Sequence, residues 1–198
     1  MSTIRLSTIA SRLSARVPRD TGEPDDKHAA VAVIFRERVP ERGPELLFIK
    51  RADKETDPWS GHMAFPGGRQ DPRDADLLHT ALRETREEVG LALGPERLIG
   101  RLDAIGAVNR TGRIPLAITP FVFSIGDADP VLVPKLDEVA EVHWTALEPL
   151  LRGEAQTTFP FEREGERLEF PAFKVGERIV WGLTYRMLGD LFAAIRET

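Results

Sequence analysis

Short apolar runs separated by polar turns dominate the first third of the chain. Residues 29–35 (AAVAVIF) are short, apolar and partly β-branched, which predicts a buried strand. A second strand is predicted at 45–51 (ELLFIKR), and the polar loop between the two runs favours a hairpin. A short apolar piece at 63–65 then leads into residues 66–68 (PGG), which predict a tight turn.

The pattern changes to a helical period over residues 74–89. The positions expected to face the core are Leu78, Leu82, Thr85 and Val89. Asp74 or Asp76 can cap the start of this helix, because a side-chain oxygen there can accept a hydrogen bond from a free backbone N–H. Gly90 follows the last turn and predicts the stop.

The remaining pattern predicts mainly strands, followed by a closing helix. The expected strands are 97–105, 116–124, 140–145 and a late hairpin pair, 159–169 and 173–181, with turns at 164–165 and 176–177. A helical turn is expected at 147–151 and an amphipathic helix at 183–196, with Leu183, Met187, Leu191 and Ile195 on its apolar face. This order favours an α+β layered fold in which helices cover a mixed sheet.

The length of 198 residues fits one domain with small additions. Residues 1–28 are expected to form an N-terminal helix and a linker, and residues 29–198 the main domain. Residues 18–28 are rich in Pro, Gly and Asp, which is typical of a linker. Arg5 and Arg12 interrupt the apolar N-terminus, so it lacks the pattern of a secretory signal; an organelle presequence is the alternative to a helix lying on the domain.

Composition and charge exclude some classes of protein. There are no cysteines, which excludes disulfides, thiolate zinc sites and cysteine nucleophiles and fits a cytoplasmic location. The net charge of −5 disfavours nonspecific binding to nucleic acid, but bound cations can reverse the charge of one pocket for a phosphorylated substrate. No apolar run approaches the roughly 20 residues that span a bilayer, so no membrane contact is expected. The oligomeric state stays open, with a homodimer as one option.

Clustered acids on the central helix are the main candidate for chemistry. Glu84, Glu87 and Glu88 lie three and four residues apart, so their carboxylates share neighbouring faces of one helix. Acids near the end of a helix repel one another and oppose its dipole, and a hard divalent cation such as Mg²⁺ offsets this repulsion. The upstream Gly67 and Gly68 permit close approach of backbone to a ligand. The alternatives are a solvated helix face and an ordinary tight turn.

The segment from Gly68 onward resembles the Nudix box, whose pattern is Gly, five residues, Glu, seven residues, then Arg-Glu-apolar-x-Glu-Glu-x-Gly-apolar. Residues 83–91 (RETREEVGL) match the second half position by position, with Thr85 in the apolar slot. In the first half, Asp74 stands where the pattern has Glu, and eight residues instead of seven separate it from Arg83. This departure is interpreted as a one-residue insertion in the loop before the helix.

Segments outside the box resemble the coenzyme A pyrophosphatase branch of the same family. They are Gly61-x-x-x-Phe65-Pro66-Gly67-Gly68, Leu46-Leu47, 119–122 (TPFV), 137–142 (DEVAEV) and 181–184 (WGLT). The resemblance therefore extends from about residue 29 to the C-terminus. One departure is Asp57, which stands where the branch usually has Arg, four residues before Gly61.

The resemblance implies a Nudix-like layered fold with a mixed β-sheet between helices. It also implies that Glu84, Glu87 and Glu88 ligate one or more Mg²⁺ or Mn²⁺ ions, with the Gly67 carbonyl as an extra ligand. Arg83 is expected to orient this cluster by ion pairing, because it lies within helical reach of Glu87.

The implied reaction is hydrolysis of a diphosphate linkage, in which a carboxylate accepts a proton from the attacking water. The candidates for this carboxylate are Glu84 and the later pair Glu138 and Glu141. The implied substrate is a small nucleoside diphosphate derivative, coenzyme A or an acyl-CoA first. The alternatives are NADH, ADP-ribose or a nucleoside triphosphate, and a binding module of the same fold without turnover.

Five further side chains are candidates for substrate contacts. Trp59 and Phe65 can stack on an adenine, or can simply pack in the core or at its rim. Arg51, Arg69 and Arg110 can bind phosphate through paired hydrogen bonds.

Overall fold

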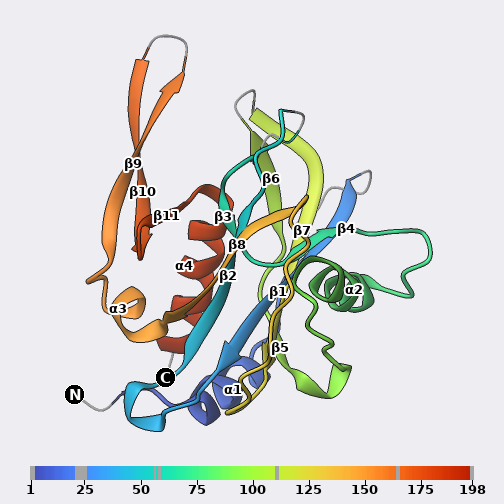
Figure 1. The fold of residues 1–198 in the computed structure, drawn as a ribbon, viewed down its shortest axis with the longest axis vertical. Helices are drawn as coiled ribbons and strands as arrows, with labels where there is room; N and C mark the ends of the chain where they lie inside the picture. Colours follow the sequence, from blue (N-terminus) through green and yellow to red (C-terminus); the bar gives the residue numbers. More distant parts are fainter. Residues whose placement is uncertain are drawn as a thin grey trace.

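The computed structural model describes residues 3–20, 26–55, 57, 59–109, 112–163 and 166–196. In chain order, the elements are α1 (Leu6–Ser14), β1 (Lys27–Arg36), η1 (Pro40–Arg42), β2 (Glu45–Arg51), β3 (Met63–Ala64), β4 (Gly67–Arg69), α2 (Leu77–Val89), η2 (Pro95–Arg97), β5 (Leu98–Arg101), β6 (Ile105–Asn109), β7 (Gly112–Ser124), β8 (Val139–Ala146), α3 (Leu147–Leu151), β9 (Gln156–Arg163), β10 (Glu166–Val175), β11 (Arg178–Trp181) and α4 (Gly182–Arg196). Helices lie on both sides of the central strands (Figure 1).

The large sheet is mixed, as the sequence predicted. β1 runs parallel to β7, with nine paired positions from Lys27 to Phe35. On its other side, β1 pairs antiparallel with β4 near its start and with β2 at its end, where Phe35 lies opposite Leu46. The predicted hairpin therefore exists only at its closed end. The sheet forks beyond it, since β2 leaves β1 to pair with β3 and β8.

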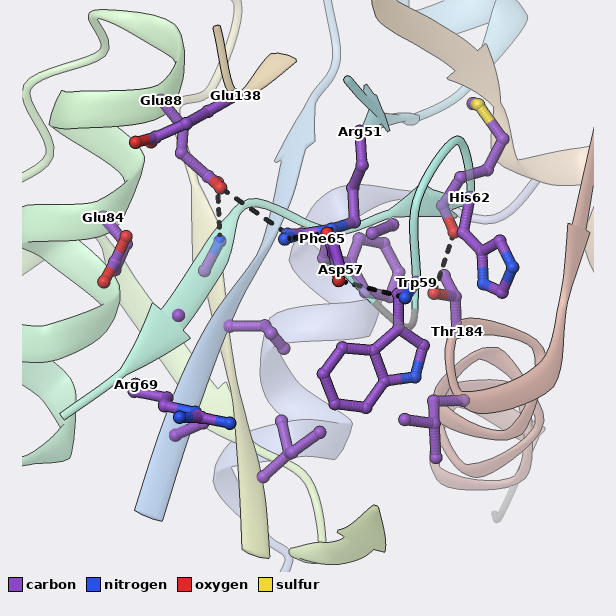
Figure 2. A pocket seen from close by; sticks show the side chains of 18 of the residues that line it. Arg51, Asp57, Trp59, His62, Phe65, Arg69, Glu84, Glu88, Glu138 and Thr184 are labelled. Atoms are coloured by element: carbon purple, nitrogen blue, oxygen red, sulfur yellow. Dashed lines mark hydrogen bonds and ion pairs between the residues drawn. The ribbon is translucent and has the colours of Figure 1, made fainter. Parts of the chain in front are cut away.

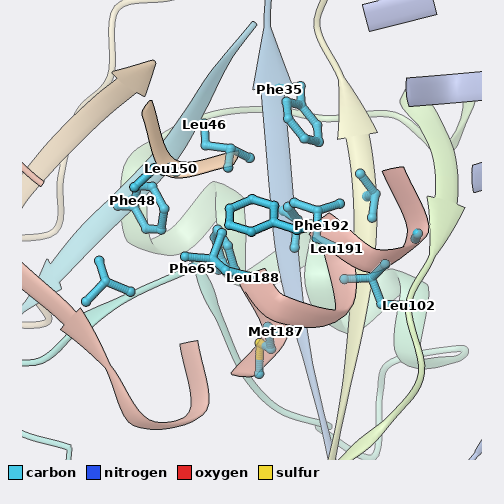
Figure 3. Packing of buried hydrophobic residues seen from close by; sticks show 14 of the residues in the cluster. Phe35, Leu46, Phe48, Phe65, Leu102, Leu150, Met187, Leu188, Leu191 and Phe192 are labelled. Atoms are coloured by element: carbon cyan, nitrogen blue, oxygen red, sulfur yellow. The ribbon is translucent and has the colours of Figure 1, made fainter. Parts of the chain in front are cut away.

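Alternate residues of β1 face two separate hydrophobic clusters, because successive side chains of a strand point to opposite sides. Val33 and Phe35 belong to a cluster that includes α1 and α4, while Ala32 and Ile34 belong to one that includes α2. Figure 3 shows the first cluster, in which Phe192 and neighbouring residues of α4 pack beside Phe35. The strand is buried on both faces, which explains its nearly continuous apolar sequence.

The N-terminal helix packs into the same core as the rest of the chain. Ile9 and Leu13 of α1 are 0% and 2% exposed, and both belong to the first cluster. After the helix, the Arg19 backbone N–H donates a hydrogen bond to Asp103 at 2.9 Å. The division of the chain at residue 28 stays a prediction. Helix α1, which lies before residue 28, packs against the core of the main domain.

The central helix ends where the sequence predicted, but its buried face is wider than the predicted stripe. Asp76 accepts the capping hydrogen bond from the His79 N–H, and Gly90 follows the helix with φ of 71°. Leu78 and Leu82 face the core as predicted and pack against the second cluster, but both are only half-buried. The fully buried positions are Thr80, Ala81, Thr85, Glu88 and Val89. Small residues on this face leave room for the helix to pack beside β1, and Glu88 lies on the same inward side.

The late strands form a second, three-stranded antiparallel sheet in the order β11-β10-β9. The predicted turn at 176–177 is present, with Gly176 at φ of 57°, whereas 164–165 lies outside the described residues. The β9–β10 pair extends well beyond the body of the molecule as an arm (Figure 1). The predicted strand 97–105 was wrong as one piece, since residues 102–104 separate β5 from β6. Within the described part of the chain, no helix combines the length and apolar character needed to cross a membrane.

Candidate functional site

One cavity collects many of the residues that the sequence singled out. Its volume of about 490 Å³ suits a small ligand. The cavity lies at the fork in the large sheet, with β4 and α2 on one side and the start of α4 on the other. Residues of β1 and β7 also line it, together with the segment between β2 and β3. Figure 2 shows the acidic side chains of α2 at one end and Thr184 of α4 at the other.

The glycine turn brings the backbone of β4 against the acidic face of α2. A β-carbon at Gly68 would lie 2.4 Å from Glu84 Oε1, so any side chain there would displace this carboxylate. At Gly67, φ is 156°, and a β-carbon would lie 2.3 Å from the Ala30 carbonyl oxygen. Gly67 therefore requires glycine because of the backbone beside it, whereas Gly68 leaves room for the Glu84 carboxylate.

Glu88 is the most deeply buried acid of the cluster. Its side chain is 5% exposed, and its Oε2 accepts a hydrogen bond from the Gly67 N–H at 2.9 Å. Burial raises the pKa of the Glu88 carboxyl to about 8, although the Gly67 N–H and the Arg51 guanidinium oppose the shift. Arg51 Nη1 lies 3.9 Å from Oε1, at the outer limit of an ion pair. The carboxylate is thus short of positive charge.

Glu84 lies one turn earlier on α2, and its carboxylate is next to Gly68. Its side chain is 15% exposed, and it accepts a hydrogen bond from Arg83 Nη1 at 2.9 Å. Burial raises the pKa of the Glu84 carboxyl, while the Arg83 contact lowers it less. The helix therefore presents two desolvated carboxylates to the same cavity.

Arg83 orients the acidic face, but its principal partner is Asp74. Its Nε and Nη2 atoms each donate to Asp74 at 2.9 Å, in a paired arrangement. Its Nη1 atom bridges Glu84 and Glu87, the latter at 3.2 Å. Asp74, where the box pattern has Glu, is therefore the anchor that holds Arg83. Glu87 is 50% exposed on the outer side of this arginine and is not among the cavity-lining residues.

The two late acids lie in different places. Glu138 lines the cavity beside the α2 carboxylates, is 34% exposed, and pairs with Lys135 Nζ at 2.8 Å. Glu141 lies outside the cavity, where it pairs with Arg178 and with His143 Nε2 at 2.8 Å. The hydrogen bonds from Arg178 lower the pKa of Glu141. Of the three carboxylates predicted as candidate proton acceptors, Glu84 and Glu138 line the cavity and Glu141 does not.

The donors in the cavity fit a hard divalent cation. Glu84 and Glu88 supply oxygen atoms one helical turn apart, and burial raises the pKa of both, so positive charge is missing between them. Across the described ranges, no three acidic or histidine side chains already stand at metal-ligand spacing. Glu138 is the additional carboxylate within the same cavity that could complete such a site.

Sequence reasoning did not foresee the pairing of Arg51 with Asp57. Asp57 Oδ2 accepts from Arg51 Nε at 2.8 Å and lies 2.6 Å from Nη2, while Oδ1 accepts from the Trp59 N–H at 3.0 Å. Asp57 thereby holds Arg51 at the edge of the cavity near Glu88. The two residues are six positions apart in an irregular segment, so no helical or strand period indicates their contact.

The other predicted substrate contacts divide between cavity and core. Trp59 and Arg69 line the cavity, and Arg69 is exposed at its rim. Phe65 also lines the cavity, but it is 3% exposed and stacks on Phe48 with ring centroids 5.1 Å apart, so most of its surface belongs to the core. Arg110 lies outside the described residues.

A Nudix domain model matches residues 26–164, which is more than half of the chain. The chain therefore belongs to the Nudix family, and members of this family generally use divalent metal ions. Two solved structures share its fold. They are a MutT/nudix family protein from Enterococcus faecalis (TM-score 0.59, 17% identity, covering 97% of this chain and 70% of that one) and a NUDIX hydrolase from Alicyclobacillus acidocaldarius (TM-score 0.55, 21% identity, covering 85% and 92%).

Among individual proteins, the chain is similar to mitochondrial coenzyme A diphosphatase NUDT8. The human protein is 39% identical over 143 residues, and the mouse protein is 35% identical over 168 residues. These alignments cover 71% and 84% of this chain. The chain spans 58% of the length of the human relative and 78% of the mouse relative.

Proposed function

We propose that this protein hydrolyses the diphosphate linkage of coenzyme A or an acyl-CoA and requires Mg²⁺ or Mn²⁺. The observation that carries the proposal is the placement of Glu84, Glu88 and Glu138 in one cavity beside the glycine turn. The similarity to two relatives named as coenzyme A diphosphatases supports the substrate class. The cytoplasmic location stays a prediction, since both relatives are named as mitochondrial.

The side chains of the cavity divide the reaction between them. Glu84 and Glu88 hold the divalent cation, which when bound stabilises the negative charge that develops on the phosphate oxygens. Arg51 and Arg69 supply fixed positive charge at the cavity edge for the phosphate that the cation does not reach.

The bond changes are those of a simple hydrolysis. The oxygen of a water attacks one phosphorus atom, and the bond from that phosphorus to the bridging oxygen breaks. The proton of the water passes to Glu84 or Glu138, and the bridging oxygen leaves on the other phosphate. With coenzyme A, the products are an adenosine with separate 3′- and 5′-phosphates and a phosphopantetheine half.

A substrate panel tests this proposal directly. Purified protein with Mg²⁺ or Mn²⁺ is incubated with coenzyme A, NADH, ADP-ribose and nucleoside triphosphates, and the products are separated by chromatography. Cleavage of coenzyme A with the highest kcat/KM is expected. If NADH or ADP-ribose is cleaved and coenzyme A is not, the substrate assignment is wrong. If nothing in the panel is cleaved but ligands bind, the chain is a binding module.

Substitutions separate the roles of the acids. Glu88→Gln is expected to abolish hydrolysis while the far-UV circular dichroism spectrum stays unchanged. If Glu138 is the proton acceptor, Glu138→Gln is expected to lower kcat by at least about a hundredfold. If kcat barely changes, the proton acceptor is Glu84. Glu87→Gln tests whether Glu87 is a metal ligand. A large loss of metal affinity in this variant would mean that the exposed Glu87 side chain turns inward when the ion binds. Glu141→Gln is the matched control outside the cavity.

A further inference from the structure

The three-stranded sheet has apolar side chains on both of its faces. On one face, Phe173 stacks on Tyr185 of α4 at 4.9 Å and meets Phe192 at 5.7 Å, so this side is covered by the helix. Residues directly opposite in an antiparallel pair point to the same side, and Phe159 lies opposite Phe170 while Phe161 lies opposite Leu168. The other side, called the aromatic face, therefore consists of Phe159, Phe161, Leu168, Phe170 and Trp181.

Trp181 is the centre of the aromatic face. Its ring centroid lies 4.2 Å from that of Phe159, 5.6 Å from that of Phe161 and 6.0 Å from that of Phe170. The outer part of this face is open to solvent, since Phe170 is 38% exposed and Leu168 is 37% exposed. An apolar surface of this kind on a projecting arm favours a ligand or a partner.

The aromatic face continues directly into the cavity. Trp181 lines the cavity, and so does His62, whose ring lies 4.8 Å from that of Trp181. Apolar residues contribute much of the cavity wall, among them Met63, Leu183 and Met187, while the paired Arg51 and Asp57 lie between the glutamates and His62 (Figure 2). Thr184 adds no free donor to this wall, since its hydroxyl donates to the Met63 carbonyl oxygen at 3.0 Å. A ligand that extends from the glutamates toward the arm therefore passes the Arg51–Asp57 pair and meets apolar surface beyond it.

We propose that the aromatic face binds an apolar chain carried by the substrate, so that medium-chain and long-chain acyl-CoA bind more tightly than short-chain acyl-CoA. This inference rests on the proposed function, because it names the acyl group as the part of the substrate that leaves the cavity past Trp181. The thioester end of the substrate is remote from the diphosphate, and the arm is the apolar surface that adjoins the cavity at the end away from the glutamates.

The size of the aromatic face favours a chain over a second protein. A stable interface needs about 800 Å² from each partner. Five apolar side chains of at most about 200 Å² each, all of them more than half buried, expose less than that area. A single alkyl chain needs only a narrow strip, and the face extends about 7 Å along β9 from Phe159 to Phe161.

The expected gain in affinity follows from the methylene groups that leave water. Each buried methylene strengthens binding by about fourfold. If three methylenes of an octanoyl group lie on the aromatic face, octanoyl-CoA is expected to bind about 60-fold more tightly than acetyl-CoA.

The test measures binding without turnover. The Kd values of acetyl-CoA and octanoyl-CoA are measured by calorimetry in EDTA for the wild-type protein, and kcat/KM for both is measured separately with Mg²⁺. Phe170→Ser is expected to reduce the ratio of the two Kd values by about tenfold or more, while Phe170→Leu restores most of it. Val131→Ser is the matched control, because Val131 is an apolar side chain that is 87% exposed outside the arm.

Three outcomes overturn the inference. Equal binding of the two thioesters by the wild-type protein is one, and a ratio that Phe170→Ser leaves unchanged is another. The third is a concentration-dependent dimer in size-exclusion chromatography that Phe170→Ser dissociates, because a second copy then covers the face. Failure of the proposed function looks different: no coenzyme A derivative is hydrolysed with Mg²⁺, whatever the chain-length dependence of binding.

Discussion

Asp74 is the residue whose removal tests most sharply how the acidic face is organised. Its carboxylate is 6% exposed and receives two hydrogen bonds of 2.9 Å from Arg83. Asp74→Asn keeps the shape of the side chain but removes the charge and one of the two acceptors. Charge-assisted hydrogen bonds contribute about 1.5–3 kcal/mol each, so a loss of about 2 kcal/mol in the free energy of unfolding is expected. For a chain of this length, that loss lowers the Tm by roughly 4–8 °C.

Asp71 offers a closely matched control. Its carboxylate is also bonded by an arginine in paired fashion, with Arg73 Nε at 2.8 Å and Nη2 at 3.0 Å. Arg73 is 87% exposed, so solvent screens the pair and its contribution to stability is small. Asp71→Asn is therefore expected to lower the Tm much less than Asp74→Asn. Equal shifts of the two variants would refute the claim that burial makes the Asp74 pair strong.

The pH dependence gives the Asp74 prediction a second readout. Hydrogen bonds from Arg83 hold the pKa of the Asp74 carboxyl well below its usual range. The folded protein therefore binds this proton more weakly than the unfolded chain does. The stabilisation is fully present above about pH 4 and is lost as the pH falls toward the folded pKa. The difference in urea-unfolding free energy between wild type and Asp74→Asn is expected to shrink below pH 4, and a constant difference contradicts the ion-pair explanation.

The remaining predictions concern the buried acid, the glycine turn and the N-terminal helix. Burial raises the pKa of Glu88 in the folded protein to about 8, so in EDTA the Tm of the wild-type protein should fall relative to that of Glu88→Gln as the pH rises from about 4.5 to 8. A difference in Tm that stays constant over this pH range would contradict this. Gly68→Ala should lower kcat by at least about tenfold with little loss of Tm, since its β-carbon displaces Glu84. Ile9→Ala should cost about 2–5 kcal/mol in chemical unfolding; a negligible loss would mean that α1 adds nothing to the core.

The sequence alone determined the local features of this protein. The central helix was predictable because two candidate caps, Asp74 and Asp76, precede it and Gly90 follows it; the structure selects Asp76 as the cap. Strand β2 and helix α3 have the predicted bounds for a similar reason, since their apolar runs are short and bordered by polar residues or turns. The spacing of the acids on α2, and with it the resemblance to the Nudix box, is likewise written in the chain.

Only the tertiary structure decided which acids share a cavity. Three glutamates of α2 look equivalent in sequence, but the close approach of small helix residues to β1 buries Glu88 and leaves Glu87 outside on Arg83. Glu138 joins Glu84 and Glu88 although about 50 residues separate them, because the segment before β8 packs against the end of α2. The Arg51–Asp57 pair and the aromatic face depend in the same way on irregular backbone and strand register. Local periodicity records which side of an element is apolar, but long-range packing selects the rotation of that element and the neighbours that it meets.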